Sequence, residues 1–287
     1  MEFNCFICPL CGQALTDTGS SLRCTAGHSF DKARQGYAHL LPVQQKHALL
    51  PGDDREMVAA RRRFLAGGWY DPFCQKLCEL SASALNETEN PLIADAGCGE
   101  GYYAAAVKDA LLEAGILPRI CAFDISKFAV KAAAGQHKGI DFAVASSYAI
   151  PLSDACVDLV LNIFSPMADR EFARILKPGG TLIFAVPSAR HLWGLKEILY
   201  EKPYENEEKE IEYPGFSEID RVPVRAQLSL SAQAACDLFA MTPYAWKTGA
   251  AGRARLQALD HLETEIGFDF LVFRRENTPA GERSDMV

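Results

Sequence analysis

From residue 92 onward, short apolar runs alternate with longer segments whose apolar positions recur at helical spacing. The apolar runs predict β-strands at 92–96, 119–124, 141–145, 158–163, 180–186, 222–230 and 268–274. Each of the first five strands is followed by a helix-like segment or a long crossover, and this alternation is typical of a parallel sheet. We therefore expect an α/β fold, a Rossmann-like sheet with helices on both faces.

The part of the chain before this sheet follows a different pattern. Residues 1–30 are rich in turn residues and cysteine. Asp53 is predicted to cap a helix, because Glu56 three residues later completes a capping box. That helix is expected to run to about Leu65, and a second helix fits residues 71–85.

These changes of pattern divide the chain into four parts. We expect a metal-binding domain over 1–35, a linker with joining helices over 36–90, a sheet domain over 91–276 and a disordered tail over 277–287. Within the sheet domain, residues 201–212 hold six Glu and two Lys, which predicts a solvated helix or loop.

The composition is that of a globular chain without membrane spans. Its 287 residues are 49% apolar and 23% charged, and no apolar run approaches the length of about 18 residues that crosses a membrane. The first residues lack the basic and long apolar stretches of a secretory signal. We therefore expect a cytoplasmic location and no membrane partner.

The net charge of −8 makes the chain as a whole a poor partner for nucleic acid, but the charge is unevenly spread. Eight basic and six acidic residues precede residue 71, an excess of two positive charges, so the remainder carries −10. A polyanion would therefore bind the N-terminal part. The candidate phosphate contacts there are Lys32, Arg34, Arg61, Arg62 and Arg63. The plainer alternative for the three consecutive arginines is a solvated helix face.

Three cysteines and a histidine near the N-terminus have the spacing of a zinc site. Cys8 and Cys11 flank a turn that Pro and Gly can form, and Cys24 is followed by His28. Two such turns supply four ligands in a tetrahedron, which leaves no open position and is how structural zinc is held. Cys5 competes for the first pair, but Pro and Gly favour Cys8 with Cys11. The alternative is a set of reduced thiols without metal.

A glycine-rich loop follows the first strand of the sheet. Gly97, Gly99 and Gly101 let the backbone approach a ligand closely, with a spacing unlike that of the dinucleotide fingerprint. Asp95 lies at the end of the strand, where ligands of such sheets bind, and its carboxylate suits a cationic ligand. Asp124 ends the second strand, 23 residues after Gly101, and a carboxylate there can accept both hydroxyls of a ribose.

Two polar residues on the next strands extend this candidate site. Ser146 ends the third strand, near where an adenine would lie, and Asn162 belongs to the fourth. A helix then ends at Leu-Lys-Pro-Gly-Gly, residues 176–180, and the chain turns into the fifth strand.

The ordered set of Asp-x-Gly-Cys-Gly-x-Gly at 95–101, the strand-end Asp124 and Leu-Lys-Pro-Gly-Gly resembles the class I S-adenosylmethionine-dependent methyltransferases. The resemblance covers about residues 90–275 and implies that the domain at 91–276 binds S-adenosylmethionine. A related fold that binds another nucleoside, or a relative that binds without reacting, is the alternative.

Motifs along the whole chain narrow this resemblance. Both cysteine-containing turns and the segments 34–42, 51–53, 60–65, 99–103, 190–192 and 241–246 together resemble the RlmA-type enzymes, which methylate N1 of a guanine in 23S ribosomal RNA. The resemblance implies zinc and S-adenosylmethionine as cofactors, a 23S ribosomal RNA hairpin as partner and a homodimer as one arrangement of the chains. The cofactor residues are then expected to be Tyr70, Asp95, Gly97, Gly99, Glu100, Gly101, Asp124, Ser146, Asn162 and His191.

Several roles stay open at this point. Tyr70 fits a core aromatic equally well, His191 a polar group at a helix start, and Glu100 a first-turn residue favoured by the helix dipole. Residues 164–166 form either the place of the target base or an ordinary turn. No residue is marked as the base that takes the proton from guanine N1. The rival functions are a small-molecule methyltransferase with a structural zinc knob and an RNA-binding module with an inactive glycine-loop domain.

Overall fold

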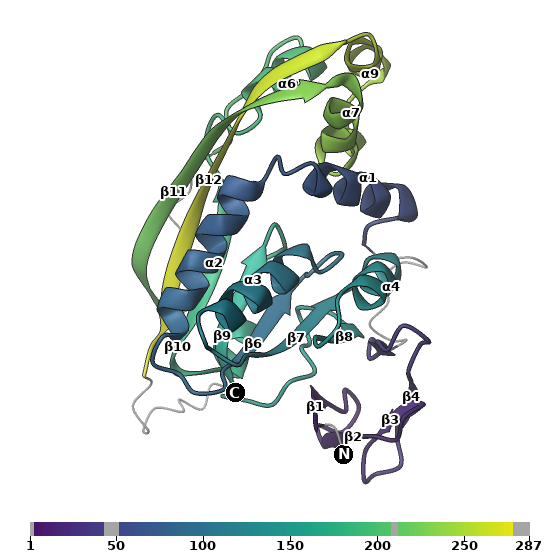
Figure 1. The fold of residues 1–287 in the computed structure, drawn as a ribbon, viewed down its shortest axis with the longest axis vertical. Helices are drawn as coiled ribbons and strands as arrows, with labels where there is room; N and C mark the ends of the chain where they lie inside the picture. Colours follow the sequence, from purple (N-terminus) through teal and green to yellow (C-terminus); the bar gives the residue numbers. More distant parts are fainter. Residues whose placement is uncertain (1–2, 43–51, 208–211, 278–287) are drawn as a thin grey trace, which may run out of the picture.

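The computed structural model describes residues 3–42, 52–207 and 212–277. Its centre is one large sheet built from β5 (Ala38–His39), β6 (Leu92–Ala96), β7 (Arg119–Asp124), β8 (Asp141–Val144), β9 (Val157–Ile163), β10 (Leu176–Pro187), β11 (Phe216–Ser231) and β12 (His261–Arg275). The strand order is β11-β12-β10-β9-β6-β7-β8-β5 (Figure 1). The strands from β10 to β5 are parallel, as predicted, whereas β12 and β11 are antiparallel to their neighbours.

One face of this sheet is covered by helices α2 (Asp71–Leu85), α3 (Tyr102–Glu113) and α4 (Lys127–Gln136) (Figure 1). Because side chains alternate along a strand, Ile93 and Leu159 point to this face. There they share a core with Leu77 of α2, Val107 of α3 and Val130 of α4.

The opposite face is covered by α5 (Asp169–Ile175) and by the N-terminal residues. These form a four-stranded sheet of β1 (Phe3–Ile7), β2 (Ala14–Asp17), β3 (Ser21–Arg23) and β4 (Ser29–Asp31). Phe6 and Leu22 from it pack in one core with Phe123 and Phe172, and the Ile7 N–H donates to the Pro151 carbonyl at 2.9 Å. Helices do lie on both faces, as predicted, but on this face the N-terminal sheet supplies part of the cover.

The last two strands form a hairpin much longer than the predicted segments. They pair from Phe216 with Arg275 to Ser231 with His261. Around its far end lie α6 (Trp193–Leu199), α7 (Ala232–Ala240), α8 (Tyr244–Lys247) and α9 (Ala250–Gln257). Figure 1 shows α6, α7 and α9 gathered there, with α1 (Arg55–Ala66) between α7 and α4. No helix in the described part of the chain is long and apolar enough to span a membrane.

The cap predicted for the first helix is displaced by one residue. Asp54, not Asp53, caps α1 by accepting the Met57 N–H at 2.9 Å. Asp53 cannot do so because it is engaged elsewhere: its carboxylate pairs with Arg61, and its carbonyl accepts the Ser126 hydroxyl at 2.6 Å. This anchors the start of α1 over the edge of the sheet where β7 ends.

Parts of other predictions lie outside the described residues. In the acidic segment 201–212, residues 201–207 form no helix or strand, and 208–211 fall outside the description. The same holds for residues 278–287 of the expected tail. The domain boundaries stay predictions, although β5, from the expected linker, pairs with β8 and so belongs to the large sheet.

Candidate cofactor site and zinc centre

The glycine loop lies between β6 and α3 in a conformation that only glycine adopts without strain. Gly97, Gly99 and Gly101 have φ angles of +79°, +55° and +80°. The Gly97 N–H donates to the Phe123 carbonyl at 2.8 Å, which ties the loop to β7. A Cβ on Gly97 would lie 2.2 Å from the Ser165 Oγ, so the loop after β9 closes directly over this glycine.

Asp124 joins this loop to the next one. Its Oδ2 accepts the Gly99 N–H at 2.9 Å, and its Oδ1 accepts the Ser126 N–H at 2.7 Å. Burial raises the pKa of Asp124, and the two backbone donors act in the opposite direction. Each carboxylate oxygen keeps a lone pair for a further donor, so a ribose hydroxyl remains chemically compatible with this arrangement.

Three buried acceptors at the same edge have no partner among the described residues. They are the Asp95 Oδ2, the Glu100 Oε2 and the Asn162 Oδ1, in side chains 2%, 6% and 0% exposed. Burial raises the pKa of Asp95 to about 7, and the Asp124 charge adds to this. Burial also raises the pKa of Glu100 to about 7, against the opposing effect of nearby arginines.

Unpartnered buried acceptors are costly, so they mark a place that a ligand with donors would complete. S-Adenosylmethionine fits this set of acceptors. It carries a sulfonium and an ammonium group, which carboxylates attract, and two ribose hydroxyls, which can donate hydrogen bonds. The side chains present therefore suit this cofactor. Asn162 also donates from Nδ2 to the Pro166 carbonyl at 3.1 Å and so shapes the loop over Gly97.

The remaining predicted cofactor residues are Ser146, Tyr70 and His191. Ser146 follows β8, half-buried, at the same sheet edge, and its Oγ accepts the Tyr148 N–H at 3.2 Å. Tyr70 and His191 lie in an aromatic cluster instead. Their ring centroids are 5.5 and 4.2 Å from that of Phe268.

His191 is neutral in this environment. Burial is the main reason that its pKa falls to about 3. Its Nδ1 accepts the Gly267 N–H at 3.3 Å, which leaves the proton on Nε2. His191 is therefore a hydrogen-bond donor and a weak base.

The aromatic cluster extends to the loop at 164–166. Phe164 has a φ of +57°, which is strained for a phenylalanine, and its ring stacks 5.0 Å from that of Phe73. It also lies 6.3 Å from Tyr70 and 6.2 Å from Tyr103, whose buried hydroxyl has no partner among the described residues. The structure thus places this loop between the glycine loop and the rings of Tyr70, Phe73, Tyr103, His191 and Phe268, which we call the aromatic wall.

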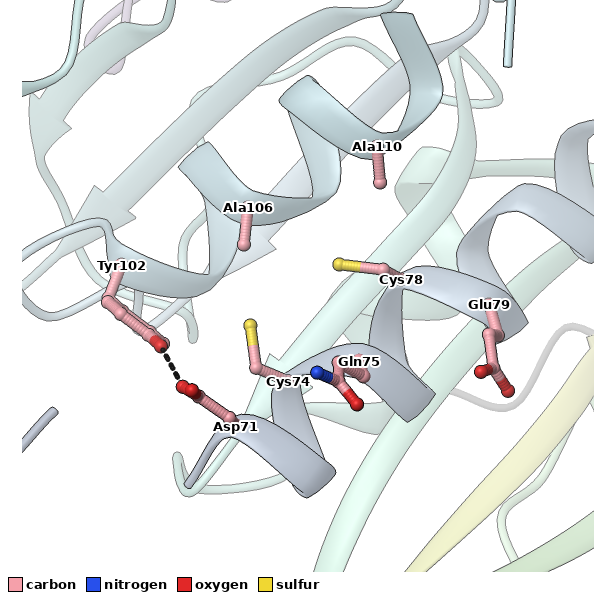
Figure 2. A pocket seen from close by; sticks show the side chains of 8 residues that line it. All are labelled: Asp71, Cys74, Gln75, Cys78, Glu79, Tyr102, Ala106 and Ala110. Atoms are coloured by element: carbon pink, nitrogen blue, oxygen red, sulfur yellow. Dashed lines mark hydrogen bonds between the residues drawn. The ribbon is translucent and has the colours of Figure 1, made fainter. Parts of the chain in front are cut away.

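A groove between α2 and α3 is a separate feature. It encloses about 440 Å³, and Figure 2 shows the Cys74 and Cys78 sulfurs pointing from α2 towards α3. At one end of the groove, the Tyr102 hydroxyl donates a hydrogen bond to the Asp71 Oδ1 at 3.3 Å. The unpartnered acceptors of Asp95, Glu100 and Asn162 do not line this groove, so it is not the candidate cofactor site.

The four predicted zinc ligands converge. The Cys8 and Cys24 sulfurs lie 3.5 and 3.4 Å from the His28 Nδ1, the Cys11 sulfur lies 3.6 Å from that of Cys24, and all four ligand atoms lie within 4.8 Å of one another. Ligands about 2.0–2.3 Å from a tetrahedral zinc are separated by similar distances. Cys5 is not part of this group.

Local backbone turns and distant packing explain this selection. The Gly12 N–H donates to the Cys8 carbonyl at 2.8 Å and the Gly27 N–H to the Cys24 carbonyl at 3.1 Å, which closes one turn under each ligand pair. Cys5 instead faces Cys121 of the large sheet, and its burial there raises its pKa.

The predicted phosphate contacts are not equivalent in the structure. Lys32 pairs with Asp17 and Arg61 with Asp53. Arg63 forms a bidentate ion pair with Asp237 of α7. Its Nε lies 3.0 Å from Oδ2 and 3.2 Å from Oδ1, and its Nη2 lies 2.5 Å from Oδ1. Arg34 and Arg62 are exposed.

Sequence reasoning missed that α1 lies over the glycine loop. A Cβ on Gly99 would lie 3.5 Å from the Arg61 Nη1, and one on Gly52 would lie 2.9 Å from the Ser126 Cβ. The available signal is the Pro-Gly-Asp segment at 51–53, which contributes to the family resemblance but predicts no contact with the loop.

Comparisons with known proteins agree with this two-part site. Residues 6–49 match the family described as RlmA, N-terminal, and residues 94–184 match the methyltransferase domain family. The zinc-ligand turns lie in the first match, and the glycine loop lies in the second. The fold and site thus define an S-adenosylmethionine-dependent methyltransferase with an N-terminal zinc ribbon.

Relatives matched over most of the chain narrow this class. The 23S rRNA (guanine(748)-N(1))-methyltransferase of Streptomyces fradiae is 35% identical, over 83% of this chain and 85% of its own length. A Micromonospora griseorubida protein provisionally named a 23S rRNA (guanine-N(1)-)-methyltransferase is 37% identical, over 88% and 90%. The chain belongs to this RlmA-type family of 23S rRNA (guanine-N1)-methyltransferases.

Solved structures are more distant. The YcgJ protein of Bacillus subtilis is 15% identical, over 71% of this chain and 99% of that chain, with a TM-score of 0.47. A likeness of this size adds nothing to the family assignment.

Proposed function

We propose that this protein transfers the methyl group of S-adenosylmethionine to N1 of a guanine in 23S ribosomal RNA. The observation that carries the proposal is the match of both parts, zinc ribbon and methyltransferase domain, to relatives named for this reaction. The position of the guanine stays open, since the number 748 belongs to one relative's name. A ribosomal RNA substrate would also place the enzyme in the cytoplasm.

The cofactor supplies an activated methyl group, and the chain's residues bind and orient it. We assign the ribose hydroxyls to Asp124 and the cationic groups to Asp95 and Glu100, whose buried oxygens lack partners among the described residues. The three loop glycines have no side chain, so the cofactor can approach the backbone closely there. The full proposed set is Tyr70, Asp95, Gly97, Gly99, Glu100, Gly101, Asp124, Ser146, Asn162 and His191.

The proton on guanine N1 must leave before or during attack. His191 is a poor acceptor for it, because its pKa is about 3 and its Nδ1 already accepts the Gly267 N–H. We therefore assign His191 to the wall of the site as a donor. The loop at 164–166 lies between the glycine loop and this wall, and we propose that the target base enters there.

The zinc ribbon and α1 are proposed to hold the RNA. Of the five basic candidates, Arg34 and Arg62 are exposed and best placed to meet phosphates, whereas Lys32, Arg61 and Arg63 already pair with carboxylates. An RNA hairpin needs a wide, shape-matched surface. Two chains in a homodimer would provide more of it than one.

Methyl transfer from labelled S-adenosylmethionine tests the proposal directly. Purified enzyme is incubated with unmodified 23S ribosomal RNA or with a mixture of small metabolites, and the RNA is digested to nucleosides for mass spectrometry. We expect 1-methylguanosine from the RNA and no label in the metabolites. Label in the metabolites alone would favour a small-molecule methyltransferase. Tight RNA binding without any transfer would favour an inactive RNA-binding module.

A further inference from the structure

The short helix α8 carries the most exposed large apolar side chain among the described residues. Trp246 is 71% exposed, although an indole is the side chain that gains most from burial. It belongs to the segment 241–246, which the sequence singled out and which neither the zinc centre nor the cofactor site uses.

The backbone under this indole is well held. The Trp246 N–H donates to the Pro243 carbonyl at 3.3 Å, and the Thr248 N–H donates to the Tyr244 carbonyl at 3.0 Å. Arg253 of α9 donates to the carbonyl of Ala245. The indole is thus presented on a braced turn, and its exposure does not come from a loose loop.

The surrounding sequence is basic in an otherwise acidic protein. Residues 238–259 contain Lys247, Arg253 and Arg255 but no Asp or Glu, a local charge of +3 against −8 for the whole chain. Arg255 donates to the carbonyls of Ile198 and Leu199, at 2.7 and 3.1 Å. None of these three basic side chains forms an ion pair within the described part of the chain, so their charge is available to a polyanion.

This basic segment adjoins the aromatic wall of the candidate site. Tyr244, two residues before Trp246, lies close enough to Tyr70 to raise the pKa of Tyr70 beyond the effect of burial. Its ring is 6.3 Å from that of Tyr200, which lies 5.5 Å from Tyr204 of the acidic segment. The described part of the acidic segment 201–212 therefore lies beside the basic one. Charge alone does not make this an RNA surface, so we expect the exposed indole to contribute to RNA binding.

We propose that Trp246 stacks on an unpaired nucleobase of the ribosomal RNA, beside the guanine that is methylated, while Lys247 meets a neighbouring phosphate. Aromatic side chains hold splayed-out bases of single-stranded RNA in this way, and basic residues beside them hold the backbone. The inference rests on the proposed function and adds a second RNA contact at the far end of the β11–β12 hairpin, apart from the zinc ribbon (Figure 1).

The test compares Trp246→Leu with Trp246→Phe, which keeps a ring, in the full-length zinc-loaded enzyme. The probe is unmodified 23S ribosomal RNA. Loss of one base stack should weaken RNA binding by about 5- to 100-fold in the Leu variant, and the Phe variant should lose much less. Leu117→Ala, at a residue 65% exposed in the loop between α3 and β7, is the control and should bind like the wild type.

Salt titration separates stacking from charge. The Leu variant should keep the wild-type slope of log affinity against log salt, whereas Lys247→Gln should lower it by about 0.7. Cofactor affinity and melting temperature should stay at wild-type values in both.

Three outcomes would overturn the inference. One is wild-type RNA affinity in Trp246→Leu. Another is an equal loss in Leu and Phe variants. The third is a change of molecular mass in light scattering with Trp246→Leu, which would assign the indole to a contact between two copies of the chain. If the wild type methylates RNA while these results occur, only this inference fails; if the wild type labels no RNA, the proposed function fails as well.

Discussion

Replacing Asp124 by Asn tests the cofactor site at its most connected residue. The carboxylate accepts the Gly99 N–H at 2.9 Å on one oxygen and the Ser126 N–H at 2.7 Å on the other. An amide keeps one acceptor and sets a donor against one of these N–H groups. It therefore loses at least one charge-assisted bond within the protein and the negative charge offered to a ribose.

The expected loss follows from the strength of such bonds. A hydrogen bond to a charged group contributes about 1.5–3 kcal/mol, so S-adenosylmethionine should bind Asp124→Asn about 10- to 100-fold more weakly. Calorimetry with the cofactor measures this, and thermal unfolding of the same sample measures the change in stability.

Asp158→Asn is the matched control at the opposite edge of the sheet. The Asp158 Oδ2 accepts the Leu92 N–H at 2.9 Å, and its Oδ1 accepts Lys177 at 2.7 Å. This variant should lose similar stability while cofactor affinity stays at the wild-type value. Equal cofactor affinity in Asp124→Asn and the wild type, or equal losses in both variants, would refute the reasoning.

Three further predictions concern the metal, pH and α1. Cys11→Ala should lower zinc below one atom per chain in elemental analysis, whereas Cys156→Ala should not, since of these two only Cys11 lies in the Cys/His cluster. Cofactor affinity should rise between about pH 6 and 8, because the pKa values of Asp95 and Glu100 are both near 7 and each carboxyl attracts a cation only once it has ionised; Asp95→Asn should remove the Asp95 part of this rise and leave the part that Glu100 contributes. Arg63→Gln should lower the free energy of unfolding by about 1–3 kcal/mol in denaturant titrations, because it leaves the buried Asp237 carboxylate without its two-pronged partner, while the salt slope of RNA binding stays unchanged.

The pH dependence of stability has the opposite sign to that of binding. Without cofactor, the raised pKa of Asp95 means that the folded state holds a proton that the unfolded chain has lost. Its contribution to stability is therefore greatest below the ordinary carboxyl pKa near 4 and is lost as the pH rises through about 7. The test is the melting temperature of the cofactor-free enzyme measured against pH. If Asp95→Asn and the wild type show the same pH dependence, the burial argument is contradicted.

Much of the candidate site could be predicted because its signals are local. The zinc ligands are defined by two tight turns of a few residues, so the spacing of Cys8, Cys11, Cys24 and His28 was sufficient. The glycine loop and the strand-end Asp124 follow from strand ends that share one edge of a parallel sheet. Each depends on backbone geometry within a short stretch. The apolar pattern placed β6 to β10 to within a few residues, underestimated the length of the hairpin strands and did not predict the short strands β1 to β5.

The sequence pattern could not predict the roles of residues that depend on partners outside their own helix. Arg61, Arg62 and Arg63 form one basic run in the chain, yet the first pairs with Asp53 and the third with Asp237. Helix geometry turns consecutive residues to different sides, so Arg61 meets Asp53 just before α1, and only the packing of α1 against α7 brings Arg63 to Asp237.

The amino-acid sequence by itself determined the two chemical centres and the alternation of strands and helices, because ligand spacing, glycine turns and apolar period act over short distances. Tertiary structure alone decided that the zinc ribbon covers a face of the large sheet, that α1 lies over the glycine loop and that the acceptors of Asp95, Glu100 and Asn162 are buried without partners among the described residues. These features arise from contacts between segments far apart in the chain, and no local pattern encodes which distant surfaces will meet.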